Sequence, residues 1–130
     1  MKRLTDIGFR KVGEWQADNG EIKLNIFDLA DANNILYAFM FDGQVLYVGK
    51  TTQRLKSRMY GYQKPGATQS TNIKGKRLIQ ELLSNGKKVD IFALPDDGLH
   101  KLGMFHLNLA AGLEDSIVKT LKPKWNETGK

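Results

Sequence analysis

The first half of the chain carries the hydrophobic pattern of β-hairpins. Residues 22–26 alternate between apolar and polar side chains, which predicts a half-buried strand, and Asp18-Asn19-Gly20 before them is a hairpin signal. Residues 35–41 and 44–48, which are apolar apart from Gln44, lie on either side of Asp42-Gly43, so we expect a second hairpin with both faces covered. Residues 89–94 predict a third core strand.

A first helix is expected after the second hairpin, with Thr51 or Thr52 as its N-cap. One side of this helix is apolar at helical spacing, at Leu55, Met59 and Tyr62. The segment 63–71 that follows contains a Pro-Gly pair and several small polar residues, which indicates a loop.

Two more helices are expected in the second half of the chain. One begins after Asn72 and stops at Gly86, with a buried stripe at Leu78, Ile79, Leu82 and Leu83. The other spans residues 108–121 and is ended by Pro123. The predicted fold is α/β in the α+β sense: a small three-stranded, mostly antiparallel sheet flanked by helices. Residues 1–34 would form an N-terminal β-hairpin extension, and residues 35–130 the main domain.

Composition narrows the chemistry. The chain has 130 residues, of which 41% are hydrophobic and 26% charged, as in ordinary globular domains. It has no cysteine and only two histidines, His100 and His106, so thiolate zinc sites, disulfides and cysteine nucleophiles are excluded. Neither a signal peptide nor an apolar run of membrane-spanning length is present, so we expect a cytoplasmic protein.

The net charge of +6 is concentrated in one stretch. Residues 50–80 contain basic side chains and no acidic ones; the basic residues are Lys50, Arg54, Lys56, Arg58, Lys64, Lys74, Lys76 and Arg77. A block of one sign is typical of a surface that binds a polyanion, and nucleic acid is the first candidate. The alternative is a solvated basic face with no partner.

A carboxylate on the last predicted helix is out of place. Glu114 lies one turn from Ala110, Ile117 and Val118, which puts it toward the apolar stripe. Carboxylates are almost never fully buried unless they are paired, protonated or bound to a metal. A glutamate at the edge of the stripe that reaches water, or pairs with an arginine, remains the alternative.

Several polar residues together resemble the motifs of the GIY-YIG nuclease family in order and spacing. They are Tyr37, then Tyr47-Val48-Gly49, then Leu55 with Arg58 three residues later, then Glu114 and Asn126. The resemblance covers residues 35–126 and is closest to the family's small stand-alone phage enzymes, which share a Pro-x-Trp-Asn ending such as residues 123–126.

The sequence departs from the family pattern at three places. Residues 35–37 keep the tyrosine of the first motif but lack the glycine that names the family. The distance from Tyr47 to Arg58 is one residue longer than in many relatives, so Arg54 is a rival, although Arg58 keeps the Leu-x-x-Arg register. Tyr62 stands where many relatives have histidine.

The resemblance implies a phosphodiester hydrolase, an endonuclease that cuts double-stranded DNA with Mg²⁺ or Mn²⁺. Glu114 would be the only protein ligand of the metal, and Arg58 a second positive group on the same phosphate. Tyr37 would be the general base, with Lys50 the nearest cation to favour its phenolate. Tyr47 and Tyr62 would position water and phosphate.

Asn126 would orient neighbouring groups through its amide. The DNA backbone would be contacted by the remaining basic side chains, Arg54, Lys56, Lys64, Lys74, Lys76 and Arg77. A role of Lys74 or Lys76 in catalysis is left open, as is self-association. Target choice would come from residues 1–34, residues 61–76 or association of copies.

Two other functions compete with this interpretation. A non-catalytic DNA-binding protein on a degenerate nuclease scaffold should have lost at least one motif residue, most readily Glu114, and none is missing. A structure-specific repair nuclease usually carries extra domains.

The loop of the second hairpin decides whether two motif tyrosines share a face. Side chains alternate along a strand, so a two-residue turn of Asp42-Gly43 would put Tyr37 opposite Val48, and the tyrosines on different faces. We expect instead a three-residue loop that ends in Gly43 at positive φ, with Tyr37 directly opposite Tyr47.

Overall fold

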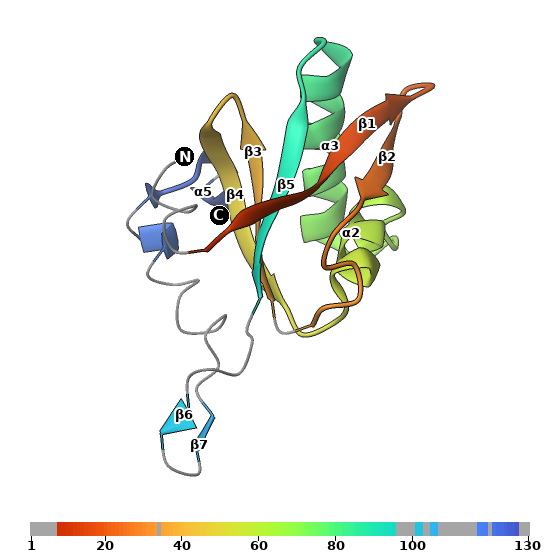
Figure 1. Cartoon of the computed structure of the whole chain (residues 1–130). Helices are drawn as coiled ribbons and strands as arrows, with labels where there is room; N and C mark the ends of the chain where they lie inside the picture. The colour runs from red at the N-terminus through yellow and green to blue at the C-terminus, as the bar shows by residue number, and fades with distance from the viewer. Residues whose placement is uncertain are drawn as a thin grey trace.

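The computed structural model describes residues 8–33, 35–95, 101–102, 105–106, 117–119 and 121–127. Its main feature is a five-stranded sheet in the order β2-β1-β5-β3-β4 with antiparallel neighbours (Figure 1). The strands are β1 (Arg10–Asp18), β2 (Glu21–Ile26), β3 (Ile35–Phe41), β4 (Gln44–Thr51) and β5 (Val89–Pro95). The helices are α2 (Leu55–Gln63), α3 (Ser70–Ser84) and the short α5 (Lys124–Glu127). A separate small pair is formed by β6 (Lys101–Leu102) and β7 (Phe105–His106).

The α+β class is confirmed, but the prediction of a three-stranded sheet is wrong. Strand β1 pairs with β5, from Arg10 opposite Ala93 to Trp15 opposite Val89, so the N-terminal hairpin extends the sheet to five strands. The predicted turn of this hairpin is present, with Asn19 and Gly20 both at positive φ. The prediction did not include the pairing of β5 with both β1 and β3. The apolar run of β5 indicates that the strand is buried, but not how many strands pair with it.

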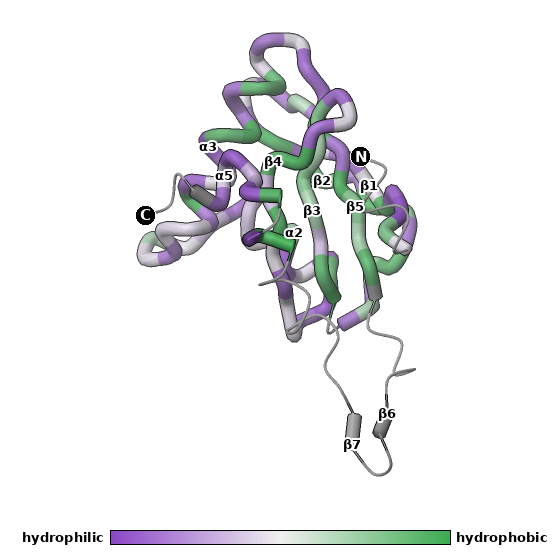
Figure 2. Tube along the Cα trace, turned by 90° about the vertical axis from the view of Figure 1, so that its left-hand side faces the viewer, coloured by the Kyte–Doolittle hydropathy of each residue, from purple (hydrophilic) through white to green (hydrophobic). Residues whose placement is uncertain are grey.

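Strand β3 lies in the interior of the sheet and is buried on both faces, as its unbroken apolar run predicts. One face, with Tyr37 and Phe39, packs in a core to which α2 and α3 contribute. The other face, with Leu36 and Ala38, packs in a second core with Ile117. Strands β3 and β5 are mostly green along the tube in Figure 2, in keeping with this burial.

The β3–β4 hairpin differs from the prediction in its loop. Gly43 has positive φ as expected, but Asp42 does too, and the turn contains only these two residues, with Phe41 opposite Gln44. A β-bulge then shifts the register, so that Met40 faces Val45 and Phe39 faces Tyr47. The extra residue is Leu46, which packs in the same core as Tyr47.

The bulge brings Tyr37 and Tyr47 to one face of the sheet, whereas the prediction had assigned this effect to a three-residue loop. Tyr37 lies opposite Gly49 and diagonal to Tyr47, not opposite Val48 and not directly opposite Tyr47. The rings of Tyr37 and Tyr47 pack with centroids 6.1 Å apart. The shared face is therefore confirmed, and the direct cross-strand pair is wrong.

Helix α2 begins later than predicted, because Thr51 is still the last residue of β4. Arg54 occupies the N-cap and makes no side-chain cap bond. The first amide groups of the helix donate instead to the connector before β3, Leu55 N to Ala32 O and Lys56 N to Ala30 O. The predicted apolar face is buried as expected.

Helix α3 begins at Ser70, before Asn72, which is therefore inside its first turn. The predicted stop is confirmed by Gly86, which has positive φ. The helix predicted over 108–121 lies mostly outside the described residues, and so does Glu114. Of its C-terminal part, residues 117–119 and 121 are helical, and Lys122 at positive φ leads into Pro123. No helix in the described part of the chain is long and apolar enough to cross a membrane.

Each edge strand of the sheet is met by a side-chain amide. On β2, the Leu24 amide donates to Gln63 Oε1 of α2 over 2.8 Å. On β4, the Val48 amide donates to Asn126 Oδ1 over 2.8 Å, and Asn126 Nδ2 donates to the Val48 carbonyl over 2.9 Å. Asn126 thus pairs with β4 as a neighbouring strand would, and it attaches α5 to the sheet beside Tyr47.

Candidate active site

Three of the motif tyrosines surround one arginine. Tyr37 comes from β3, Tyr47 from β4, and Arg58 and Tyr62 from successive turns of α2; we call these four residues the Arg58–tyrosine cluster. The hydroxyls of Tyr37 and Tyr62 lie 2.7 Å apart, and Arg58 Nη2 donates to Tyr62 Oη over 3.0 Å. The Arg58 guanidinium also stacks 4.4 Å above the centre of the Tyr62 ring.

Two glycines allow the tyrosines to pack this closely. A Cβ on Gly49 would lie 2.6 Å from Tyr37 Oη and 2.8 Å from a carbon of the Tyr47 ring. A Cβ on Gly75 of α3 would lie 2.7 Å from the Tyr62 ring. The glycine after Tyr47-Val48 is therefore required by the space that Tyr37 fills.

The cluster holds the Tyr37 and Tyr62 phenols in the neutral form. Burial raises the pKa of Tyr37 well above the usual value, and nearby Tyr47 raises it further, while Arg58 and the hydrogen bond with Tyr62 act in the opposite direction. Burial likewise raises the pKa of Tyr62, with Arg58 again opposing. Burial tends to lower the pKa of Arg58, but the three tyrosines raise it, so the guanidinium stays charged.

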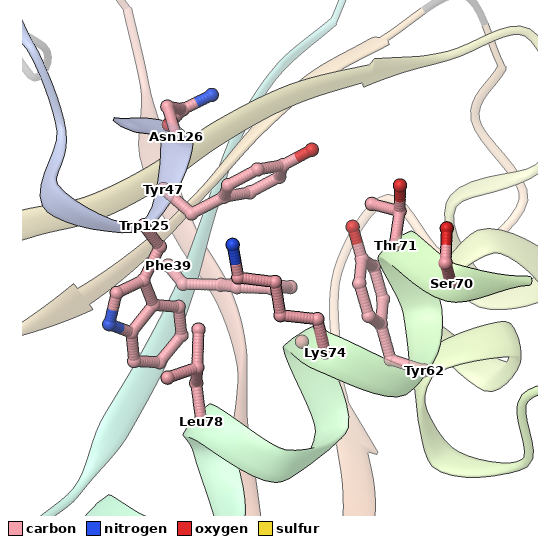
Figure 3. Close-up of a pocket in the computed structure, with 10 residues that line it drawn as sticks. Phe39, Tyr47, Tyr62, Ser70, Thr71, Lys74, Leu78, Trp125 and Asn126 are labelled. Atoms are coloured by element: carbon pink, nitrogen blue, oxygen red, sulfur yellow. The ribbon is translucent and has the colours of Figure 1, made fainter. Parts of the chain in front are cut away.

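A cavity of about 380 Å³ opens beside the cluster. Figure 3 shows Trp125, Phe39 and Leu78 at one end, and the hydroxyls of Tyr62, Thr71 and Ser70 at the other. Tyr47, Lys74 and Asn126 complete the lining. A second, polar cavity of about 520 Å³ shares Ser70 and Thr71 with the first and has Arg58 on its wall.

The structure brings together most of the sequence-predicted site residues. Tyr37, Tyr47, Arg58 and Tyr62 form the cluster, and Asn126 lines the same cavity as Tyr47 and Tyr62. Arg54 is not a rival for the arginine position, because it is largely exposed and lies 3.8 Å from Asp31. Glu114 lies outside the described residues.

Lys50 is not brought to the tyrosines. It is exposed and lies opposite Leu36 in the β3–β4 register, whereas Tyr37 lies opposite Gly49. Alternation along the strand therefore directs Lys50 to the other face of the sheet from Tyr37. The cation beside the Tyr37 phenol is Arg58, so the expectation that Lys50 favours its phenolate does not fit the geometry.

The predicted DNA-contacting cations fall into two groups. Arg54 and Lys56 lie within ion-pair distance of Asp31, and Lys76 pairs with Glu21 of the β1–β2 hairpin at 3.1 Å. No ion pair to Lys64, Lys74 or Arg77 is found among the described residues. Lys64, Lys74 and Arg77 are therefore the cations of this set that are open to phosphate.

Sequence reasoning missed Asn72, whose side chain is buried and accepts a hydrogen bond from Arg58. The sequence analysis began the helix after Asn72 and gave this residue no role, whereas it lies inside the first turn of α3. Trp125 and Trp15 are buried in the core, as expected of tryptophan.

The chain is 29% identical over 136 residues to Endonuclease II of Enterobacteria phage T4, across 97% of this chain and 96% of that protein. Its fold matches the solved structure of a bacteriophage T4 EndoII variant with a TM-score of 0.75 and 26% identity, over 97% of this chain and 98% of that one. The chain is a homologue of phage endonuclease II. The GIY-YIG motifs identified in the sequence fit this relationship, although no family model matches the chain.

A more distant likeness concerns the fold alone. A restriction endonuclease in complex with product DNA matches with a TM-score of 0.54 and 18% identity, over 91% of this chain and 76% of that one. With endonuclease II, this places the Arg58–tyrosine cluster in a fold that is shared among nucleases.

Proposed function

We propose that this chain is a DNA endonuclease that hydrolyses phosphodiester bonds with the help of a divalent metal ion. The observation that carries the proposal is the Arg58–tyrosine cluster at the wall of an open cavity, in a homologue of endonuclease II. Tyr47, Tyr62 and Lys74 line one cavity, and Arg58 lines the polar cavity that adjoins it at Ser70 and Thr71. A permanently charged donor, phenols and a lysine around two adjoining cavities suit a phosphate group in the course of hydrolysis.

Arg58 is the group that would bind the phosphate. Its guanidinium is held by stacking on the Tyr62 ring and by hydrogen bonds to Tyr62 Oη and Asn72 Oδ1. A planar donor fixed in this way meets a phosphate oxygen in one geometry and loses little entropy on binding. Lys74, which lines the cavity, would add a second positive charge.

The general base would be a phenolate shared by Tyr37 and Tyr62. Tyr62 lines the cavity and Tyr37 does not, so the Tyr37 hydroxyl would exchange protons with the cavity through the Tyr62 hydroxyl, 2.7 Å away. Burial disfavours the phenolate, whereas Arg58 favours it on both residues. Because two neutral phenols cannot accept a proton, the pair would first have to release one to solvent, with Arg58 balancing the charge of the phenolate. The proton of the attacking water would then pass to Tyr62 and, across the shared hydrogen bond, to Tyr37, which leaves both phenols neutral and the Arg58 charge available to the phosphate.

The described residues alone do not form a metal site. They contain no group of three or more His, Cys, Asp or Glu side chains that could hold an ion. Mg²⁺ or Mn²⁺ prefers oxygen ligands and commonly keeps several waters beside one or two carboxylates. Glu114 is the proposed carboxylate, and the ion would neutralise charge on the phosphate.

The experiment uses supercoiled plasmid, the purified protein, and either Mg²⁺ or a chelator. We expect nicked and linear products with Mg²⁺ and none with the chelator. Glu114→Gln should abolish cleavage but leave DNA binding intact or tighter, because a negative charge that faces phosphate is removed. If the unaltered protein leaves the plasmid intact under all metal conditions, the proposed function is wrong; near-normal cleavage by Glu114→Gln would contradict only the metal ligand.

A further inference from the structure

Arg58 is held from the α3 side by a chain of neutral amides. Arg58 Nη1 donates to Asn72 Oδ1 over 2.5 Å, and Asn72 Nδ2 donates to Gln69 Oε1 over 3.0 Å. The same Gln69 oxygen accepts the Gly66 backbone amide over 2.9 Å. The chain therefore runs from the loop before α3 to the arginine of the cluster.

Donor-only groups at both ends fix the direction of every bond in this chain. A guanidinium can only donate, so Asn72 must present its oxygen to Arg58 and its amide nitrogen to Gln69. A backbone N–H can also only donate, so Gln69 must present its oxygen to Gly66 and, with it, to Asn72. An aspartate at position 72 could keep the first bond but would set two acceptors against each other at Gln69.

The contacts of Arg58 are all neutral. Among the described residues, no carboxylate lies within ion-pair distance of it, and its partners are Asn72, Tyr62 and the ring of Tyr37. Buried or half-buried arginines are ordinarily paired with an acid, because an uncompensated charge is costly to desolvate. The fold here orients the guanidinium without cancelling its charge.

We propose that Asn72 is a positioning residue that aims Arg58 at a phosphate oxygen while leaving its positive charge free for the substrate. This inference rests on the proposed function. Arg58 has five N–H donors, and the bonds to Asn72 and Tyr62 use two of them. Arg58, Gln69 and Asn72 line the polar cavity of about 520 Å³, where a phosphate could meet the other donors.

Gly61 supports this assignment. It lies inside α2, where glycine is less favourable to a helix than alanine. A Cβ at this position would lie 3.2 Å from Asn72 Nδ2 and 3.8 Å from Arg58 Nη1. The missing side chain therefore gives Asn72 the room to reach Arg58 from the neighbouring helix.

The test compares three substitutions of Asn72 by DNA binding at several salt concentrations and by cleavage kinetics. Asn72→Asp should raise the Kd for DNA about 10-fold and reduce the log–log salt slope by about 0.9, because one phosphate contact loses its charge. Asn72→Ala should leave Kd within about two-fold and lower kcat about 10-fold, because Arg58 keeps its charge but its guanidinium is no longer held in one orientation. Asn72→Ser, which retains a neutral acceptor, should recover part of the kcat lost in the alanine variant.

Asn85→Asp is the matched control, since it adds the same charge at the other end of α3 and should leave Kd and slope unchanged. Equal losses in all three Asn72 variants, in step with their thermal midpoints, would mean a merely structural role and overturn the proposal. An unchanged slope in Asn72→Asp would overturn it as well. If Asn72→Asp does not fold, serine against alanine decides: equal kcat values in the two contradict the proposal. The salt slope is measured on binding alone, so failure of the unaltered protein to cleave DNA would count against the proposed function and not against this result.

Discussion

The hydroxyl oxygens of Tyr37 and Tyr62 lie 2.7 Å apart, and Arg58 Nη2 donates to Tyr62 Oη over 3.0 Å, while the guanidinium lies 5.9 Å from the centre of the Tyr37 ring. The two phenols are therefore unequal, because Tyr62 lies closer to the arginine and joins it to Tyr37.

The unequal roles predict an order of stability for two Tyr-to-Phe variants. Tyr62→Phe leaves the buried Tyr37 hydroxyl and Arg58 Nη2 without their partner, so it should lower the free energy of unfolding by about 2 kcal/mol. Tyr37→Phe leaves Tyr62 bound to Arg58 and should lower it by about 1 kcal/mol. Urea unfolding monitored by tryptophan fluorescence measures both, and the reverse order would contradict the bonding pattern.

The raised pKa values predict weakening at alkaline pH. An unfolded tyrosine loses its proton near pH 10, whereas the folded Tyr37 and Tyr62 keep theirs to higher pH. The contribution of the two protonated phenols to the stability of the fold is thus complete below about pH 10. It is lost as the pH rises toward the pKa values of Tyr37 and Tyr62 in the folded protein. In that window the free energy of unfolding should fall by about 2.7 kcal/mol per pH unit for the two phenols together. Urea titrations from pH 8 to pH 11 test this, and Tyr37→Phe should halve the slope.

Ion pairing predicts that two adjacent cations differ in DNA binding. Arg77 has no ion pair among the described residues, whereas Lys76 is bound to Glu21. If Arg58 and the three cations without an ion pair each contact a phosphate, about four contacts form. The plot of log Kd against log salt concentration should then have a slope of magnitude about 3.6. Arg77→Ala should reduce that magnitude by about 0.9, and Lys76→Ala by much less. Equal effects in a salt titration would show that the Glu21 pair opens on binding.

The Asn126 amide predicts a link between the edge of the sheet and activity. Asn126→Ala leaves the Val48 N–H and C=O without this partner, which should cost about 2 kcal/mol and loosen β4 beside Tyr47, so cleavage should fall too. Gln63→Ala is the control at the other edge: it removes the bond to Leu24, should cost about 1 kcal/mol and should leave kcat unchanged. Unfolding and cleavage assays on both variants separate the effects.

Much of the fold could be predicted because the sequence states it locally. Asn19-Gly20 and Gly43 mark turns by their positive φ, Gly86 ends α3, and the apolar run of β3 reports that both of its faces are buried. The number of strands could not be predicted in this way, since the pairing of β1 with β5 joins segments that are far apart in sequence.

The residues of the Arg58–tyrosine cluster could be selected from the sequence, but the contacts between them could not be predicted. Spacing from Leu55 selected Arg58, which the structure places beside Tyr62. The face on which Tyr47 lies depends on the bulge at Leu46, and in a strand of apolar residues no alternation marks a bulge. Lys50 was chosen because it follows Gly49 in sequence, although strand alternation directs it away from Tyr37. Asn72 gave no signal, because an asparagine near the start of a helix is ordinarily a cap.

The two edge amides bear on how copies of this chain can meet. A strand from another molecule that docked along β2 or β4 would need the outward N–H of Leu24, or the N–H and C=O of Val48. Gln63 and Asn126 already occupy these groups, so an incoming strand would have to displace a folded helix to continue the ladder. Growth of the sheet from molecule to molecule, which is the first step toward fibres, is therefore opposed at both margins.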